Sequence, residues 1–324
     1  MWKRSARGRT QKEWKPRPRG GARPGAERRP PPAAPPPKDD TSWDEVASWY
    51  DALVGEKGSS YHRDIVIPGA LRLLDPRPKE SVLDLACGQG VFCRALHKLG
   101  VAVTGVDASE RLISLARSRS SPAIRYEVAD ARRMAALPVQ GFDAVACLLA
   151  LENMDTVTPV FAECARVLRP GGRLVLVIMH PCFRIPRQSG WGWDEGRHLQ
   201  YRRVDSYLSD MKVPIQVHPG SDPGQVTWTF HRPLAAYVRA LAGAGLLVQA
   251  LEEWPSTRVS LPGPRAQAEN RARDEIPMFL ALKAVRVAAS GAPQAPPREA
   301  ARPSGRAMMA RRPRRKGAFR DRNK

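Results

Sequence analysis

The sequence predicts an α/β fold, a three-layer sandwich in which helices cover both faces of a mostly parallel sheet. Short apolar runs alternate with amphipathic stretches of helix length between residues 81 and 179. The run at 173–179, RLVLVIM, is apolar at nearly every position, as expected for a strand covered on both faces. A glycine-rich turn at 86–90 joins the first strand to the next helix. This strand–helix rhythm is typical of parallel sheets with helices on both sides.

The first half of the expected order begins with a helical region at residues 43–74, where Trp43, Val46, Trp49 and Tyr50 share one face. Ser109 stands where it would cap a helix N-terminus. Strands and helices then alternate as strand 81–85, helix 91–99, strand 101–106, helix 109–119 and strand 124–128.

The second half of the order contains a long interruption. We expect strand 142–149, helix 157–168 ended by Pro170-Gly171-Gly172, and strand 173–179. The pattern resumes with a helix at 233–244, and two strands at 246–252 and 277–285 that we expect to form a hairpin at the sheet edge. The stretch between, about 181–232, is rich in Gly, Pro, charge and aromatic residues, and we interpret it as an aromatic-rich insertion with a few antiparallel strands.

Both ends of the chain are strongly basic. Residues 1–38 hold 12 Lys and Arg against 2 acids, and residues 286–324 also hold 12 against 2. Residues 39–285 hold 29 basic and 28 acidic residues, so the net charge of +21 lies almost entirely in the ends. The first end has nine prolines and no Val, Ile, Leu or Phe, too few apolar groups to offset chain entropy. We therefore expect two disordered basic tails around one domain at 39–285.

The cysteines and the apolar runs favour a cytoplasmic protein. The five cysteines are scattered and form no Cys-x-x-Cys pair, which suits a reducing compartment. No apolar run approaches the roughly 18 residues that span a bilayer, and no apolar segment follows the basic N-terminus as in a secretory signal. We also find no cluster of metal ligands and expect no metal.

The turn after the first strand has the features of a ligand-binding loop. It reads Asp84-Leu85-Ala86-Cys87-Gly88-Gln89-Gly90. Gly88 and Gly90 allow a sharp turn and close approach of a ligand, and the helix that follows offers free N–H groups. The third glycine of a dinucleotide fingerprint would fall at Cys93, and its replacement argues against NAD or FAD.

Two acids follow the next two strands. Asp107 closes the second strand, where a carboxylate can accept hydrogen bonds from ribose hydroxyls. Asp130 follows the third strand, where a carboxylate can accept from an adenine amino group. The carboxyl ends of parallel strands share one edge of the sheet, where open α/β sheets bind ligands. Each residue alone has a structural explanation, as a turn glycine or a helix cap, whereas the ordered set favours an adenosine-containing ligand.

These segments resemble the class I S-adenosylmethionine-dependent methyltransferases of small-molecule type. VLDLACGQG is similar to the family's first motif, with Ala86 in place of a frequent glycine. FDAVACLLALENM and ARVLRPGGRLVLVIMHP resemble its later segments. The resemblance spans about 80–180 and extends loosely to 285. It implies a Rossmann-like fold with a seven-stranded sheet, an antiparallel last strand, and S-adenosyl-L-methionine as the methyl donor.

The resemblance also implies roles for individual residues. Asp84, Gly88 and Gly90 would line the methionine part of the donor, and Asp107 would hold ribose. Asp130 with Ala131 would face adenine, and Leu148 or Leu149 would border the pocket. Ala86 and Ala108 are further cofactor-binding candidates. Tyr50, Tyr61 and His62 resemble an N-terminal region that closes over the donor, although core packing explains the tyrosines nearly as well.

The catalytic candidates are His180, just past the 173–179 strand, and Glu152, after the 142–149 strand. Methyl transfer from a sulfonium depends mainly on positioning, and a base is needed only if the acceptor loses a proton. The alternative interpretation of His180 is a histidine that bonds the loop backbone, and Glu152 is a base or an orienting group. Cys182 is disfavoured as a nucleophile because Pro-Cys does not follow the fourth strand.

Three functions remain open. The nearly neutral domain and the aromatic stretch favour a methyltransferase acting on a small molecule. The basic tails would attract phosphate and favour an RNA methyltransferase instead, although solvated tails explain them equally well. A non-catalytic regulator that binds S-adenosylmethionine is the third hypothesis.

Overall fold

The computed structural model describes residues 43–216 and 226–287. The predicted basic tails therefore lie outside the described residues, except that the last strand continues through Arg286. Among the described residues, no helix is both long and apolar enough to cross a bilayer.

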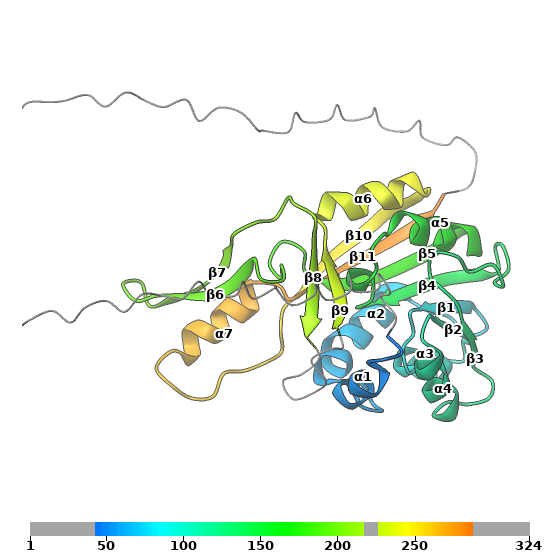
Figure 1. Ribbon diagram of the computed structural model, residues 1–324, viewed down its shortest axis with the longest axis horizontal. Coiled ribbons are helices and arrows are strands. Elements are labelled where there is room, and N and C mark those ends of the chain that lie inside the picture. The colour runs from blue at the N-terminus through cyan, green and yellow to red at the C-terminus, as the bar shows by residue number, and fades with distance from the viewer. Residues whose placement is uncertain (1–42, 217–225, 288–324) are drawn as a thin grey trace, which may run out of the picture. The chain divides into compact units, whose positions relative to one another are not determined.

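A seven-stranded sheet is the centre of the described part, with the order β10-β11-β5-β4-β1-β2-β3 (Figure 1). β11 is antiparallel to both of its neighbours, whereas β1 to β5 pair in parallel. This confirms the predicted mostly parallel sheet with an antiparallel last strand. The strands are β1 Ser81–Leu85, β2 Ala102–Asp107, β3 Arg125–Val128, β4 Phe142–Leu148, β5 Leu168–Met179, β10 Leu246–Trp254 and β11 Phe279–Arg286.

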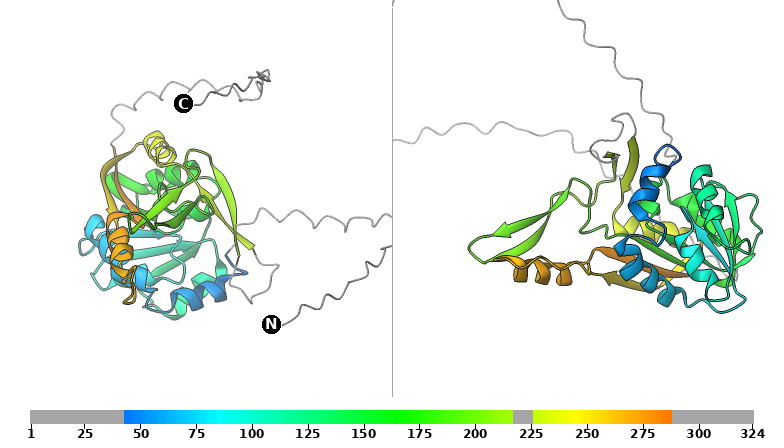
Figure 2. Two further views of the ribbon diagram at one scale, coloured as in Figure 1. Left: turned by 90° about the vertical axis from the view of Figure 1, so that its left-hand side faces the viewer. Right: turned by 90° about the horizontal axis from the view of Figure 1, so that it is seen from below.

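Helices cover the two faces of this sheet, as the three-layer prediction requires (Figure 2). One face is covered by α2 Ile67–Leu74, α3 Val91–His97 and α4 Glu110–Ser118, and the other by α5 Thr158–Val167 and α6 Leu234–Gly243. Successive residues of β1 face opposite layers. Val82 packs in the core beneath α2, α3 and α4, whereas Leu83 and Leu85 pack in the core beneath α5 and α6. The period of two in the strands thus assigns each side chain to one layer.

The N-terminal helical region is broken into pieces. α1 spans Ala47–Val54 and ends at Gly55, which has φ +68°. A short π-helix, η1 His62–Val66, then runs directly into α2. The predicted helical character of 43–74 is therefore correct, with an interruption at the glycines around Lys57.

β5 begins earlier than predicted. It starts at Leu168 and includes Pro170-Gly171-Gly172, which we expected to separate helix from strand. Its pairing with β4 shifts register between Phe142 and Ala144, so the glycines are absorbed as an irregularity of the ladder.

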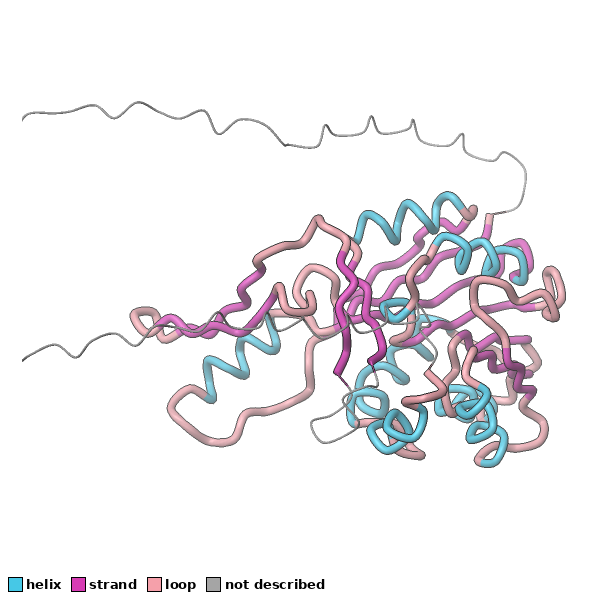
Figure 3. Tube along the Cα trace, viewed as in Figure 1, coloured by secondary structure: helices cyan, strands magenta, loops and turns pink. Residues whose placement is uncertain are grey.

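The 180–232 stretch forms two antiparallel hairpins, as the tube diagram shows (Figure 3). β6 Ser189–Asp194 pairs with β7 Leu199–Val204, and β8 Met211–Gln216 pairs with β9 Val226–His231. The β8–β9 hairpin packs against the short 3-10 helix η2 Leu151–Asn153, whereas the β6–β7 hairpin projects from the sheet (Figure 1).

β10 and β11 pair in antiparallel fashion at the sheet edge, as predicted. The connection between them contains a helix that the sequence did not reveal, α7 Ala266–Glu275. α7 packs alongside β7 (Figures 1 and 2). Its sequence, AQAENRARDE, has no large apolar residue and buries only Ala272, so it lacks the apolar stripe that identifies a helix.

Candidate active site

The turn after β1 has a backbone that favours glycine at three positions. Ala86, Gly88 and Gly90 have φ of +56°, +54° and +81°. A Cβ on Gly90 would lie 2.3 Å from the Tyr126 hydroxyl oxygen, so no larger residue fits there. Ala86, the predicted departure from a glycine, occupies the left-handed region that glycine adopts at less cost.

Asp107, at the end of β2, holds this turn in place. Its Oδ2 accepts a hydrogen bond from the Gly88 N–H and its Oδ1 from the Ser109 N–H, both at 2.9 Å. The residue is 9% exposed, and this burial raises the pKa of its carboxyl group. Each oxygen retains further lone pairs that can accept from a ligand hydroxyl. Ser109 also caps α4 as predicted, accepting from the Leu112 N–H at 3.1 Å.

Asp84 lies beneath the turn and is 2% exposed. The Cys93 thiol donates to its Oδ2 at 3.0 Å. Burial, with a smaller contribution from the nearby Asp107 carboxylate, raises the pKa of Asp84 to about 7. A cation bound beside this carboxyl group would lower its pKa and favour the ionised carboxylate.

Asp130 follows β3 and is the most exposed of the three acids. Arg132 donates to both of its carboxylate oxygens, and this holds the pKa of Asp130 below its usual value. The Ala129 N–H donates to the Asp107 carbonyl at 3.0 Å, which ties the ends of β2 and β3 together. Of the neighbouring candidates, Ala131 is buried, Ala108 is exposed and Leu148 is half-buried. The described contacts thus join Asp84, the turn and Asp107 closely, and Asp130 more loosely.

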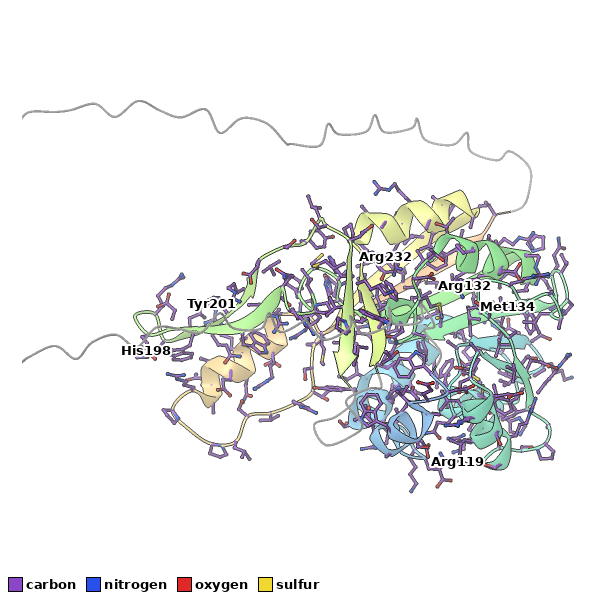
Figure 4. The ribbon with its side chains drawn as sticks, viewed as in Figure 1. Arg119, Arg132, Met134, His198, Tyr201 and Arg232 are labelled. Atoms are coloured by element: carbon purple, nitrogen blue, oxygen red, sulfur yellow. The ribbon has the colours of Figure 1, made fainter. Side chains whose placement is uncertain are left out.

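α1 covers the glycine turn. A Cβ on Gly88 would lie 3.3 Å from Tyr50 Cε1, so this ring lies directly over the turn. Gln89 donates to the Gly55 carbonyl at 2.7 Å and accepts from Arg119 at 2.7 Å. Arg119, labelled in Figure 4, also pairs with Asp51 of α1. The sequence singled out Tyr50, but Gln89 and Arg119 show no local pattern that would have identified them.

Glu152, in η2, has one satisfied and one unsatisfied oxygen. Its Oε1 accepts from the Met179 N–H at 3.3 Å, at the end of β5. Its Oε2 is shielded from solvent and has no hydrogen-bond partner among the described residues. Burial raises the pKa of Glu152 to about 7. The β8–β9 hairpin contacts the backbone of this residue, since Thr229 Oγ1 donates to the Glu152 carbonyl at 3.2 Å.

His180 is 2% exposed and both ring nitrogens have protein partners. Nδ1 accepts from the Cys182 N–H at 3.2 Å, so Nε2 bears the proton and donates to Glu253 Oε1 at 2.7 Å. Burial lowers the pKa of His180, which keeps the ring neutral. These contacts match the interpretation of His180 as a loop-bonding residue, and they leave Glu152 as the candidate with a free oxygen.

The aromatic stretch is divided between two places. Trp193 of β6 packs under the Arg265 guanidinium, 4.6 Å from its ring centroid, and beside His198. Figure 4 places His198 and Tyr201 on the projecting hairpin, away from Arg232 and the sheet. Strand β9 of the second hairpin packs against η2 and so lies beside Glu152. Trp191, on β6 of the first hairpin, is contacted by Arg184 and Arg202 instead.

No group of three or more potential metal ligands occurs in residues 43–216 and 226–287. All five cysteines are free thiols.

The raised pKa of Asp84 predicts how the stability of the protein depends on pH. Its pKa in the folded protein exceeds the unfolded value, so its contribution to the free energy of unfolding is present at low pH and is lost as pH rises from about 4 to 7. Asp84→Asn removes this titration. Chemical denaturation at pH 5 and pH 8 should show a smaller loss of stability in the variant than in wild type.

The control is Asp130→Asn, because the pKa of Asp130 is lowered and its titration falls below this window. That variant should keep the wild-type difference between pH 5 and pH 8. An unchanged difference in Asp84→Asn would contradict the assigned burial of a protonated carboxyl group.

Comparisons with known proteins agree with this geometry. Residues 83–176 match the model of a methyltransferase domain family. The chain is 38% identical over 98 residues to the ubiquinone biosynthesis O-methyltransferase of Xanthomonas oryzae pv. oryzae, covering 29% of this chain and 41% of that protein. The corresponding enzyme of Thiobacillus denitrificans is 36% identical over 111 residues, covering 32% and 48%. The matched segment thus spans less than half the length of these two relatives.

Solved structures extend the likeness to most of the described part. The S-adenosylmethionine-dependent methyltransferase of Mesorhizobium loti aligns with a TM-score of 0.56 and 28% identity, covering 72% of this chain and 100% of that one. A protein of Listeria monocytogenes aligns with a TM-score of 0.53 and 24% identity, covering 68% and 98%, which supports the fold. The chain therefore carries a methyltransferase domain with the class I fold of the S-adenosylmethionine-dependent methyltransferases.

Proposed function

We propose that this chain binds S-adenosyl-L-methionine at the carboxyl ends of β1, β2 and β3 and transfers its methyl group to a small-molecule acceptor. The observation that supports this most strongly is the bond between Asp107 and Gly88, which brings a carboxylate and a bare glycine turn together at one sheet edge. When bound, the donor supplies an activated methyl group, so the protein must mainly position an acceptor.

The residues at this edge suit the parts of such a donor. Asp107 has lone pairs for ribose hydroxyls, and Asp130 with Ala131 lies after the adjacent strand for adenine. Asp84 is a buried carboxyl group beneath the turn, which favours a cationic sulfonium nearby. Gly88 and Gly90 allow close approach of the methionine part. Ala86 lies in the same turn, Ala108 follows Asp107, and Leu148 borders the site from the end of β4.

On the acceptor side, we assign Glu152 as the candidate base and His180 as a positioning residue. Glu152 Oε2 has no hydrogen-bond partner in the described part of the chain and can accept a proton from an acceptor hydroxyl or amine. His180 has no nitrogen left for an acceptor, and it connects the loop after β5 to Glu253 on β10.

A small-molecule acceptor is favoured over RNA. The curated relatives are ubiquinone biosynthesis O-methyltransferases, and residues 39–285 are nearly neutral overall. The basic tails that motivated the RNA hypothesis lie outside the described residues. The free state of all five cysteines agrees with the cytoplasmic location that the sequence predicts.

Donor binding gives the first test. Asp107→Ala removes the acceptor for ribose and frees the turn, so calorimetric titration with S-adenosylhomocysteine should show a loss of about 1–3 kcal/mol in binding free energy. Asp143→Asn is the matched control, because Asp143 lies at the opposite end of the sheet and accepts from the Ser81 N–H. Equal affinities of Asp107→Ala and wild type would reject the ribose assignment.

The acceptor class is tested by incubating the chain with methyl-labelled donor and cell extract, and separating RNA, protein and metabolites. We expect label in the metabolite fraction, because the unpaired Glu152 oxygen is shielded from solvent beside the β8–β9 hairpin. Label in RNA alone would replace this proposal by the RNA hypothesis. Absence of label from every fraction would support a non-catalytic regulator.

Glu152 is tested with the acceptor that this labelling identifies. The rate of transfer should rise with pH through about 7, because Glu152 must lose its proton to accept another. Glu152→Gln should abolish this rise and lower kcat about 10²- to 10⁴-fold. His180→Gln should retain the rise. A wild-type pH profile in Glu152→Gln would reject the assignment of Glu152 as the base.

A further inference from the structure

Two arginines share one indole at the base of the β6–β7 hairpin. The guanidinium carbons of Arg184 and Arg202 each lie 5.2 Å from the ring centroid of Trp191. Arg202 is the cross-strand partner of Trp191 in this hairpin, and Arg184 comes from the loop after β5. Neither arginine forms an ion pair with an acid in the part of the chain that the structure describes.

Their charges are only partly compensated. Burial, together with the nearby positive charge of Arg202, lowers the pKa of Arg184 to about 10. Burial also lowers the pKa of Arg202. A buried guanidinium is normally paired with a carboxylate or a phosphate, and these two are not paired with an acid among the described residues. The Trp191 ring face offers only a part of that stabilisation.

Hydrogen-bond donors are left over as well. Arg184 Nε is shielded from solvent and has no partner among the described residues, and its Nη2 makes one long contact of 3.5 Å with the Ile276 carbonyl. Arg202 donates through Nε to the Phe183 carbonyl and through Nη2 to Ser189 Oγ. The remaining N–H donors of the two guanidinium groups have no hydrogen-bond partner among the described residues and can donate to an anionic oxygen.

The pair lies at the sheet edge where we place the acceptor. Arg184 is close enough to His180 to lower the pKa of that ring. Tyr61 also lies near Arg184. The Tyr61 ring packs on Phe279, the first residue of β11, with 5.7 Å between the ring centroids. Glu253, an acid near the end of β10, is bonded to His180.

We propose that Arg184 and Arg202 form an anion-binding pair that holds a carboxylate or phosphate group of the small-molecule acceptor. This inference rests on the proposed function, since it assigns a substrate class to the same sheet edge. Two arginine forks suit such groups because they offer parallel N–H donors in a fixed plane. A shielded guanidinium at the base of a hairpin suits one small anion better than a polymer backbone, which is bound by exposed basic residues.

The test uses the full chain and two probes, inorganic phosphate and benzoate, titrated at constant ionic strength and followed by calorimetry. Arg184→Gln and Arg202→Gln should each weaken binding of at least one probe about tenfold to a hundredfold, the loss of one charge-assisted hydrogen bond. Arg203→Gln is the matched control. It is the next residue of β7, is paired with Asp205 and has a 64% exposed side chain.

Donor affinity, measured in parallel with S-adenosylhomocysteine, should remain at the wild-type value in all three variants. Retained donor affinity shows that the variants are folded, and a failure of wild type to bind the donor would count against the proposed function alone. Phosphate preference over benzoate would identify a phosphorylated acceptor, and the reverse a carboxylate.

Three results would overturn the proposal. One is equal affinity of wild type, Arg184→Gln and Arg202→Gln for both probes, and another is no binding of either probe to wild type. The third is binding of a short oligoribonucleotide that depends on Arg184 and Arg202 while neither small probe competes, which would assign the pair to nucleic acid.

Discussion

The bonds from Asp107 to the Gly88 and Ser109 amides are the constraint on which the candidate site depends. One carboxylate satisfies the turn after β1 and the start of α4, so the first two strand ends are fixed relative to each other. The turn itself has three left-handed residues, and Tyr50 packs over it from α1. A buried carboxylate that accepts backbone donors is costly to displace. The structure therefore holds the proposed donor site in one arrangement.

The charges at the sheet edge are divided between two ends of the site. Asp84, Asp107 and Glu152 are carboxyl groups whose pKa values are raised by burial, and they surround the ends of β1, β2 and β4. Arg184 and Arg202 are cations whose pKa values are lowered by burial, beyond the end of β5. Each group gains from a ligand of opposite charge. A cationic sulfonium at the acidic end and an anionic acceptor at the basic end would both be stabilised by this division.

Much of the sheet and of the donor edge was predictable because local patterns encode them. Apolar runs located the strands, and the glycine turn with Asp107 needed no knowledge of distant contacts. α7 was missed because it buries only Ala272, and Pro170-Gly171-Gly172 was misplaced because a parallel neighbour absorbs it into β5. His180 and Glu152 looked equivalent in sequence, and only their partners Glu253, Cys182 and Met179 separate them. Arg184 and Arg202 meet through the β6–β7 pairing, which a sequence pattern does not specify.

A crystal structure of the chain with S-adenosylhomocysteine would locate the donor site. We expect the ribose hydroxyls within hydrogen-bond distance of Asp107 and the homocysteine part against Gly88 and Gly90, with the sulfur facing Glu152. The Asp107–Ser109 bond should persist in the complex. Density for the ligand elsewhere on the sheet, or a ribose without contact to Asp107, would contradict the account.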